Sequence, residues 1–477
     1  MKLSLLVSLA AANDGLQESF DDYWPANIDS HARMLQTVAE HPEASEVEFF
    51  GRIPPWMQGS FVRNGPGIYE WGEDKYHHFF DPNGIITRFH INGGGMDQDA
   101  SIHFHSKYLE STNFKQNSEA QAIVNPEVGT YGEPDWVSKD ENGEEITDER
   151  ELKKQRLKFL MQAYPTSNSL VSLVPFHGWL LSMNESPIVH LIDPVTLEAV
   201  HEIDLRKSKG FDGYKIMTFT AHGMYDLKDG SFWNTAIGVD LNGSVPRVGI
   251  VVVKFPGAAR SEANPFENKA TPQEILDSMV MSETIHTSSN PLDLEIPYFH
   301  MFAITENYIV LPFTSVALDA KDVLGEMLEA RPLVTALKYH PNRPFTYHMF
   351  NKNTFELEER YFETDPGVCV HTINAFETPE GNIHLDTAVA GNGDIFQMYG
   401  YETINATGIE LHEKFESILP VGKPVTYTFE VRLSQTTGYL TKFRWTKNLH
   451  YLVKQSGHQA LICLIQKTKR MTLGAVS

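Results

Sequence analysis

Short stretches of alternating apolar and polar residues recur along most of the chain, separated by turn-forming residues. Residues 59–92 show the pattern clearly: turns rich in Gly, Asn and Pro at 64–67 and 81–84 flank runs such as residues 85–91. Alternation of this kind is typical of half-buried β-strands, and Gly, Pro, Asn and Asp mark the turns between them. Many short strands at this spacing predict an all-β sandwich, barrel or propeller.

One hairpin pattern occurs twice. Residues 190–198 (His-Leu-Ile-Asp-Pro-Val-Thr-Leu-Glu) align with residues 348–356 (His-Met-Phe-Asn-Lys-Asn-Thr-Phe-Glu). In both, an apolar strand meets Asp193 or Asn351, whose side chain can bond its own backbone two residues further on and so fix a turn. A hairpin that recurs at a distance is what two blades of a propeller would show.

Three segments depart from the strand pattern. Residues 319–329 predict a helix on the surface. Residues 138–156 are mostly charged, and we expect them to be a solvated, partly helical insertion without a function of its own. Residues 431–477 contain no Asp or Glu but eight Lys and Arg, which indicates a divergent tail.

The predicted organisation therefore has three parts. Residues 1–20 form an N-terminal segment, either a signal peptide or disordered, because one Lys precedes an apolar run and small residues. Residues 21–440 form the β-domain with the insertion 138–156, and residues 441–477 are the divergent tail.

Composition limits the possible partners. The net charge is 39 − 62 = −23, which argues against a nucleic-acid partner. Two cysteines are too few for a disulfide framework and suit a reducing compartment. No apolar run reaches the ~18 residues of a membrane-spanning helix. We expect a cytoplasmic protein, or a secreted one if the N-terminus is a signal peptide.

The candidate chemistry lies in three histidines, His222, His300 and His371, in similar apolar settings. We expect residues 296–312 to form a strand, a tight turn and a second strand, with His300 projecting from the first strand. The histidines lie 78 and 71 residues apart (300 − 222 and 371 − 300), so different blades could bring them to one metal ion.

Spacing alone is not specific, because the chain has 20 histidines and a histidine on an apolar strand is often a hydrogen-bonded core residue. Glu185 follows an apolar strand and could accept the second ring N–H of a metal-binding histidine. The alternative for Glu185 is an ordinary turn carboxylate.

Several motifs together resemble the carotenoid cleavage oxygenases, in particular the animal branch with the β-carotene oxygenases and the retinoid isomerohydrolase of the retinal pigment epithelium. The resemblance covers about residues 20–440, and its motifs lie at residues 59–67, 76–81, 220–222, 297–308, 371–377 and 422–425.

This resemblance implies a seven-bladed β-propeller with capping loops and short helices, and an axial Fe(II) held by four histidines. His222, His300 and His371 match three of the ligands, Glu185 matches a carboxylate behind them, and no catalytic residue is expected beyond the metal site. The implied reaction is cleavage of a carotenoid or apocarotenoid double bond by O₂ to aldehydes such as retinal, by a protein associated peripherally with membranes.

The chain also departs from the family pattern. The family's fourth histidine, in a Phe-His-Gly context, has no counterpart, since His450 and His458 lack that context. We therefore expect an incomplete last blade. Trp136 follows Pro-Asp where the family has Cys, and Pro82 follows Asp81 where it has Gly. Two alternatives stay open: an inactive carotenoid- or retinoid-binding propeller, and a retinyl-ester isomerohydrolase, which Trp136 makes less expected.

Overall fold

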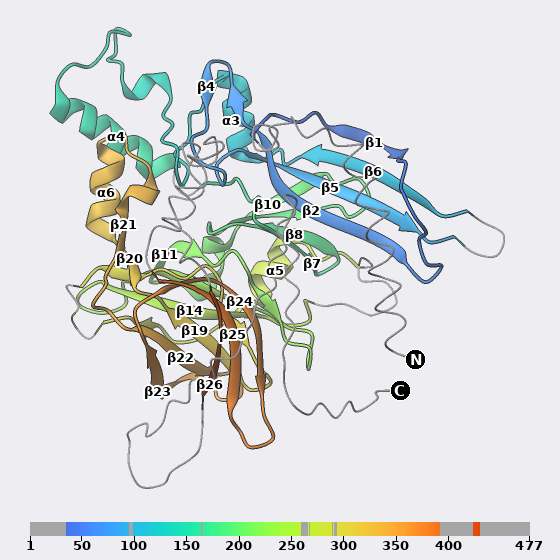
Figure 1. Cartoon of the computed structure of the whole chain (residues 1–477). Coiled ribbons are helices and arrows are strands. Elements are labelled where there is room, and N and C mark those ends of the chain that lie inside the picture. The colour runs from blue at the N-terminus through green and yellow to red at the C-terminus, as the bar shows by residue number, and fades with distance from the viewer. Residues whose placement is uncertain are drawn as a thin grey trace, which may run out of the picture.

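The computed structural model describes residues 35–94, 99–163, 166–258, 266, 268–288, 290, 293–391 and 423–429, the last of these by backbone alone. Within these ranges the chain is mostly β, with a few short helices (Figure 1). The predicted segments 1–20 and 441–477, the tail histidines His450 and His458, and any closing strands of a last blade lie outside the described residues.

The strands pair antiparallel, and each sheet has its own spatial order of strands. Two N-terminal sheets have the orders β1 (His41–Glu46), β6 (Ser101–Tyr108), β5 (Asn83–Asn92), β2 (Gln58–Ile68) and β10 (Ala199–Asp204), β9 (Ile188–Ile192), β8 (Trp179–Met183), β7 (Ser172–Phe176); β3 (Glu70–Trp71) and β4 (Asp74–Lys75) form a small hairpin. The central sheet has the order β11 (Tyr214–Phe219), β13 (Phe232–Asp240), β14 (Arg247–Phe255), β15 (Val280–Met281), with β12 (Met224–Tyr225) paired to β13 and β16 (Ile285–His286) paired to β14. Three further sheets have the orders β17 (Glu295–Pro297), β20 (Val316–Asp319), β21 (Leu337–Tyr339); β18 (Ala303–Ile304), β19 (Tyr308–Phe313), β22 (Phe345–Asn351), β23 (Glu356–Thr364); and β24 (Val368–Glu377), β25 (Ile383–Ala390), β26 (Lys423–Phe429).

The helices connect or flank these sheets. The α-helices are α3 (Thr112–Ala120), α4 (Glu149–Ala163), α5 (Pro272–Ser278) and α6 (Ala320–Leu328), and the 3₁₀ turns are η1 (Asp135–Val137), η2 (Leu205–Lys207), η3 (Lys209–Phe211) and η4 (Leu333–Ala336). Among the described residues, no helix is both long and apolar enough to cross a membrane.

Several of the sheets pack face to face, which explains the apolar pattern of the central strands. On β13, Phe232 and Ala236 face the sheet β7–β10, whereas Trp233 and Ile237 face the sheet that contains β19 and β22. Both faces of β13 and β14 are buried, so these strands are almost continuously apolar. Consecutive sheets that pack face to face are typical of propeller blades. The seven blades and the closure of the ring stay predictions.

The repeated hairpin is confirmed at both positions. The Oδ1 of Asp193 accepts the amide N–H groups of residues 195 and 196 at 2.8 and 2.9 Å. The Oδ1 of Asn351 accepts those of residues 353 and 354 at 3.0 and 3.3 Å. Both turns end in a residue with positive φ, Leu197 (60°) and Phe355 (63°), so the two turns share one backbone conformation.

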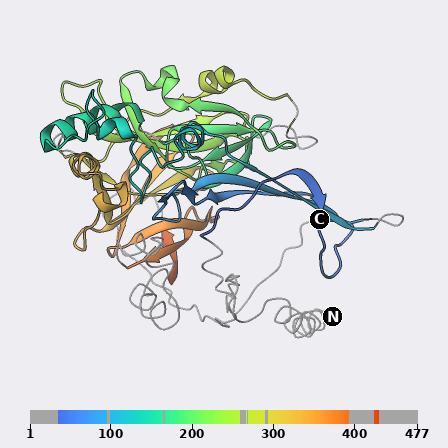
Figure 2. The same cartoon turned by 90° about the horizontal axis from the view of Figure 1, so that it is seen from above.

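The predicted helix at 319–329 is confirmed as α6, and the Asp319 side chain caps it by accepting the Lys321 N–H at 2.8 Å. In agreement with the prediction, none of the residues 138–156 is buried, and the segment is partly helical because α4 begins at Glu149. Beyond this segment, Phe159 and Leu160 of α4 pack with Met327 of α6. Seen from above, α4 and α6 lie on one side of the molecule, away from the far ends of β5 and β6 (Figure 2).

Candidate metal centre

His222, His300 and His371 are brought together by three segments that are tied to one another. His222 lies just after β11, and its backbone forms an isolated parallel bridge with Met301, the residue after His300. His371 is on β24, where the neighbouring Thr372 donates its hydroxyl to the Phe302 carbonyl at 3.0 Å. The loop 298–302 therefore joins the segments that carry the other two histidines.

The predicted strand around His300 is wrong. The strand β17 ends at Pro297 and β18 begins at Ala303, so His300 lies on the loop between them. The side chains of Phe299 and Phe302 are only 2% and 0% exposed, and this burial holds the loop in place. The strand, turn and strand of the prediction lie a few residues later, in the β18–β19 pair.

The three imidazoles form one compact cluster. Their ring centroids are 4.6 Å (His222 to His300), 5.2 Å (His222 to His371) and 5.1 Å (His300 to His371) apart. One ring nitrogen from each lies within 4.8 Å of the others. Three imidazole nitrogens at this separation can face a single metal ion, and imidazole suits iron, zinc and copper.

Glu185 lies directly behind His300. Its Oε1 is 2.5 Å from Nδ1 of His300 and accepts the Tyr298 hydroxyl at 2.6 Å. The backbone carbonyl of Glu185 also accepts the Phe219 N–H at 3.1 Å, which fixes this segment to the end of β11. A carboxylate at Nδ1 makes that nitrogen the donor and leaves the Nε2 lone pair free for a metal.

His222 fits a metal ligand by a separate observation. Its Nε2 is buried and has no hydrogen-bond partner within the described parts of the chain. Burial lowers the pKa of His222 to about 3, and the neighbouring His300 and His371 act in the same direction. The ring is therefore neutral at pH 7, and a metal ion would satisfy the buried nitrogen.

A motif near the histidines has a structural role that the sequence did not reveal. The carboxylate of Glu377, on β24, accepts the Thr305 hydroxyl at 2.6 Å and the backbone and side-chain N–H groups of Asn307 at 2.7 Å each. Burial alone would raise the pKa of Glu377, but these hydrogen bonds lower it. Glu377 thus ties the β18–β19 turn to the strand of His371.

A cavity of about 360 Å³ adjoins the cluster and is lined by all three histidines and Glu185. The rest of its wall is mainly apolar and includes Met217, Phe219, Ile296, Phe299, Leu318, Val323, Met327, Leu333, Val334, Leu337 and Val370. The site thus opens into a space suited to an apolar molecule.

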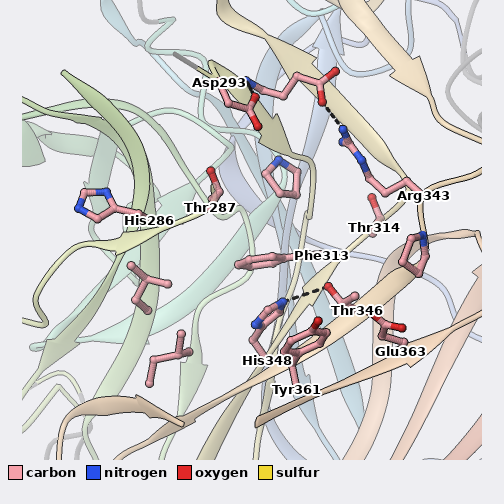
Figure 3. A pocket seen from close by; sticks show the side chains of 15 residues that line it. His286, Thr287, Asp293, Phe313, Thr314, Arg343, Thr346, His348, Tyr361 and Glu363 are labelled. Carbon is pink, nitrogen blue, oxygen red and sulfur yellow. Dashed lines mark hydrogen bonds and ion pairs between the residues drawn. The ribbon is translucent and has the colours of Figure 1, made fainter. Parts of the chain in front are cut away.

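A second cavity, of about 430 Å³, lies elsewhere and is a weaker candidate (Figure 3). Its His348 is stacked between Phe313 and Tyr361, with centroid distances of 4.3 and 5.0 Å, and its Nε2 lies 3.0 Å from the Thr346 hydroxyl. Arg343 is paired with Glu295. Since the imidazole and the guanidinium are already engaged, the cavity beside the three histidines is the better functional candidate.

Comparisons with known proteins agree with this choice. The family model described as "Retinal pigment epithelial membrane protein" (RPE65) matches residues 34–451. A mitochondrial carotenoid-cleaving dioxygenase of Mustela putorius furo is 26% identical over 387 residues, 81% of this chain and 64% of the relative. The β,β-carotene 15,15'-dioxygenase of Gallus gallus is 26% identical over 381 residues, 80% of this chain and 65% of the relative. The chain thus spans less than two thirds of the length of these relatives.

Solved structures show the same fold. Cobalt-substituted apocarotenoid oxygenase of Synechocystis has a TM-score of 0.55 at 19% identity, covering 83% of this chain and 68% of its own. A chimera of apocarotenoid oxygenase and RPE65 has a TM-score of 0.56 at 19% identity, with the same coverage. At this identity the likeness establishes the fold alone.

Proposed function

Because this chain belongs to the family described by the RPE65 model, which contains carotenoid-cleaving dioxygenases, we propose that it is a non-haem Fe(II) dioxygenase. Its reaction would add both atoms of O₂ across one double bond of a carotenoid or apocarotenoid and give two aldehydes, such as retinal. The observation that carries the proposal is the cluster of three histidines, backed by Glu185, at the wall of an apolar cavity.

His222, His300 and His371 are the proposed metal ligands. Bound Fe(II) would supply the redox chemistry with O₂ that the amino-acid side chains lack. Glu185 keeps the proton on Nδ1 of His300, and Tyr298 in turn orients Glu185 through its hydroxyl. The buried Nε2 of His222 is neutral, so it can bind metal without first losing a proton.

The apolar wall would bind and position the polyene. Side chains of β11, β17 and the loop before His300 contribute one part of it, and Val323 and Met327 of α6 another. A hydrocarbon chain displaces water from such a wall at ~25 cal/mol per Å² of buried apolar surface. Exclusion of water also protects reactive species formed during oxidation.

Peripheral membrane association is part of the proposal, because a carotenoid must be taken from a lipid phase. The helices α4 and α6 pack together, and Met327 of α6 reaches the cavity. On the outer side of the same region, Trp136, Leu157 and Met161 are 43%, 40% and 80% exposed. Co-sedimentation with phosphatidylcholine vesicles, compared between the unaltered chain and a triple Ser variant of these residues, tests this contact.

The activity is tested on the purified full chain, reconstituted anaerobically with Fe(II) and then exposed to O₂ and β-carotene or an apocarotenal. We expect stoichiometric iron and aldehyde products identified by mass. His300→Ala should abolish iron binding and product formation while its circular dichroism stays unchanged. His286→Gln, outside the cluster, should leave iron binding and product formation intact.

Two outcomes would contradict the proposal. If circular dichroism shows that the chain is folded but the chain contains no iron, the assignment of the metal site is wrong. Pigment that stays bound and intact in the presence of Fe(II) and O₂ would instead favour a carotenoid-binding protein.

A further inference from the structure

Besides Glu185, the wall of the cavity holds a second carboxyl group of which only one oxygen is hydrogen-bonded within the described residues. Glu127 is 6% exposed and lies between Pro126 and Val128, which also line the cavity. Its Oε1 accepts the side-chain N–H of Asn113 at 3.1 Å and the hydroxyl of Thr166 at 2.9 Å. Its Oε2 has no hydrogen bond within the described parts of the chain. This oxygen belongs to a largely buried side chain at the cavity wall, so it is available to a ligand in the cavity.

A neighbouring carboxyl group determines which of the two carries a proton. Burial raises the pKa of Glu127 well above its ordinary value, and the charge of nearby Asp81 raises it further. Asp81 is fully buried too, but it accepts the Thr130 hydroxyl at 2.6 Å and the Gly129 N–H at 3.1 Å. Burial still raises the pKa of Asp81 to about 7, but those donors offset part of this effect. Asp81 therefore loses its proton first as pH rises, and its charge holds the proton on Glu127.

The position of the proton follows from the hydrogen bonds. Oε1 of Glu127 already accepts two donors, so the proton of the neutral acid resides on Oε2. The segment is also held in place, because the Val128 carbonyl accepts the Val334 N–H at 2.8 Å and the Glu127 N–H donates to the Thr130 carbonyl at 2.8 Å. Glu127 therefore presents a fixed O–H donor to a mainly apolar cavity.

We propose that Glu127 Oε2 donates a hydrogen bond to an oxygen atom of the substrate, so that the cavity prefers a polyene bearing a hydroxyl or carbonyl group over a pure hydrocarbon. The inference rests on the proposed function and narrows its substrate class to oxygenated carotenoids or apocarotenoids. Discrimination of this kind is effective because a hydrocarbon would leave the buried carboxyl group without a partner.

The experiment measures pigment binding by absorption difference spectra of the metal-free full chain, so catalysis plays no part. The probes are β-carotene and its 3,3'-dihydroxy derivative zeaxanthin, which share one polyene. One net hydrogen bond predicts that zeaxanthin binds about 5- to 10-fold more tightly to the unaltered chain. Glu127→Gln keeps an N–H donor and should keep most of the preference, whereas Glu127→Leu should remove it and bind β-carotene at least as well.

A second readout applies if Glu127→Leu does not fold. In the unaltered chain, the infrared C=O band of the protonated carboxyl group, assigned by its loss in Glu127→Gln, should shift when zeaxanthin binds but not when β-carotene binds. Equal affinities for the two pigments, or a band that neither pigment shifts, would overturn the subsite while leaving carotenoid binding intact. Binding of neither pigment would overturn both the subsite and the proposed function.

Discussion

Replacement of Glu185 by alanine is the sharpest test of how the candidate metal centre is built. The substitution removes the acceptor of His300 Nδ1 and of the Tyr298 hydroxyl and leaves the three histidines in place. Without the carboxylate, the His300 ring can turn, or move its proton to the nitrogen that would face the metal. We therefore expect weaker metal binding by a chain that still folds.

The magnitude follows from the contacts. A hydrogen bond to a charged group contributes about 1.5–3 kcal/mol, which corresponds to ~10- to 150-fold in affinity. Loss of a carboxylate behind a metal-binding histidine typically costs about 10- to 100-fold. The Tyr298→Phe control removes only the second contact of Glu185, so we expect a loss below about 5-fold for it.

The assay is anaerobic titration of the metal-free chain with Co(II), followed by its visible absorption, and with Fe(II) by calorimetry. Circular dichroism and the thermal unfolding midpoint report whether each variant is folded. Unchanged metal affinity in folded Glu185→Ala would refute the reasoning that Glu185 orients His300. An equal loss in Tyr298→Phe and Glu185→Ala would assign the effect to the position of the loop rather than to the His300 proton.

Three further predictions concern the scaffold of the site. Gly223→Ala would place a Cβ 2.1 Å from the buried Phe232 ring. It should therefore lower the unfolding free energy by about 1–3 kcal/mol and weaken metal binding. In the control Gly325→Ala, in α6, the added Cβ meets no atom within 4 Å, so neither effect is expected. The pKa of Asp81 is about 7 in the folded chain against an ordinary 3.8, so the unfolded state releases this proton first as pH rises. The unfolding free energy, measured by urea titration, should therefore fall from about pH 4 to pH 7. Asp81→Asn should make this fall smaller. Asn351→Ala removes both turn hydrogen bonds and should lower the thermal midpoint through a loss of about 1–2 kcal/mol, without altering metal affinity.

Local sequence signals predicted the elements whose geometry is determined within a few residues. The turns at Asp193 and Asn351 were predictable because a side chain bonds to a backbone group two residues away, whatever the rest of the fold. The helix α6 was predictable for the same reason, since its cap at Asp319 is also a local contact.

Local sequence signals did not predict the contacts between segments that are distant in the sequence. His300 lies in a run whose pattern predicts a strand, but the segment is a loop whose Phe299 and Phe302 side chains are buried against distant parts of the chain. Likewise, the role of Glu377 as the acceptor of the 305–307 turn depends on residues 70 or more positions away. Glu127 has no distinctive motif, and only the cavity wall distinguishes it.

The candidate metal centre depends on sheet packing more than on any one strand. His222 follows a strand of the sheet β11–β15, His300 precedes β18 of a second sheet, and His371 lies on β24 of a third. Each sheet is built from local hairpins, but the histidines meet only when the three sheets are stacked, with the Met301 bridge and the Thr372 hydroxyl joining them. A metal bound by all three histidines would therefore stabilise the stacked arrangement over any partly separated one. The ratio of the metal affinities of the two arrangements sets the size of this stabilisation.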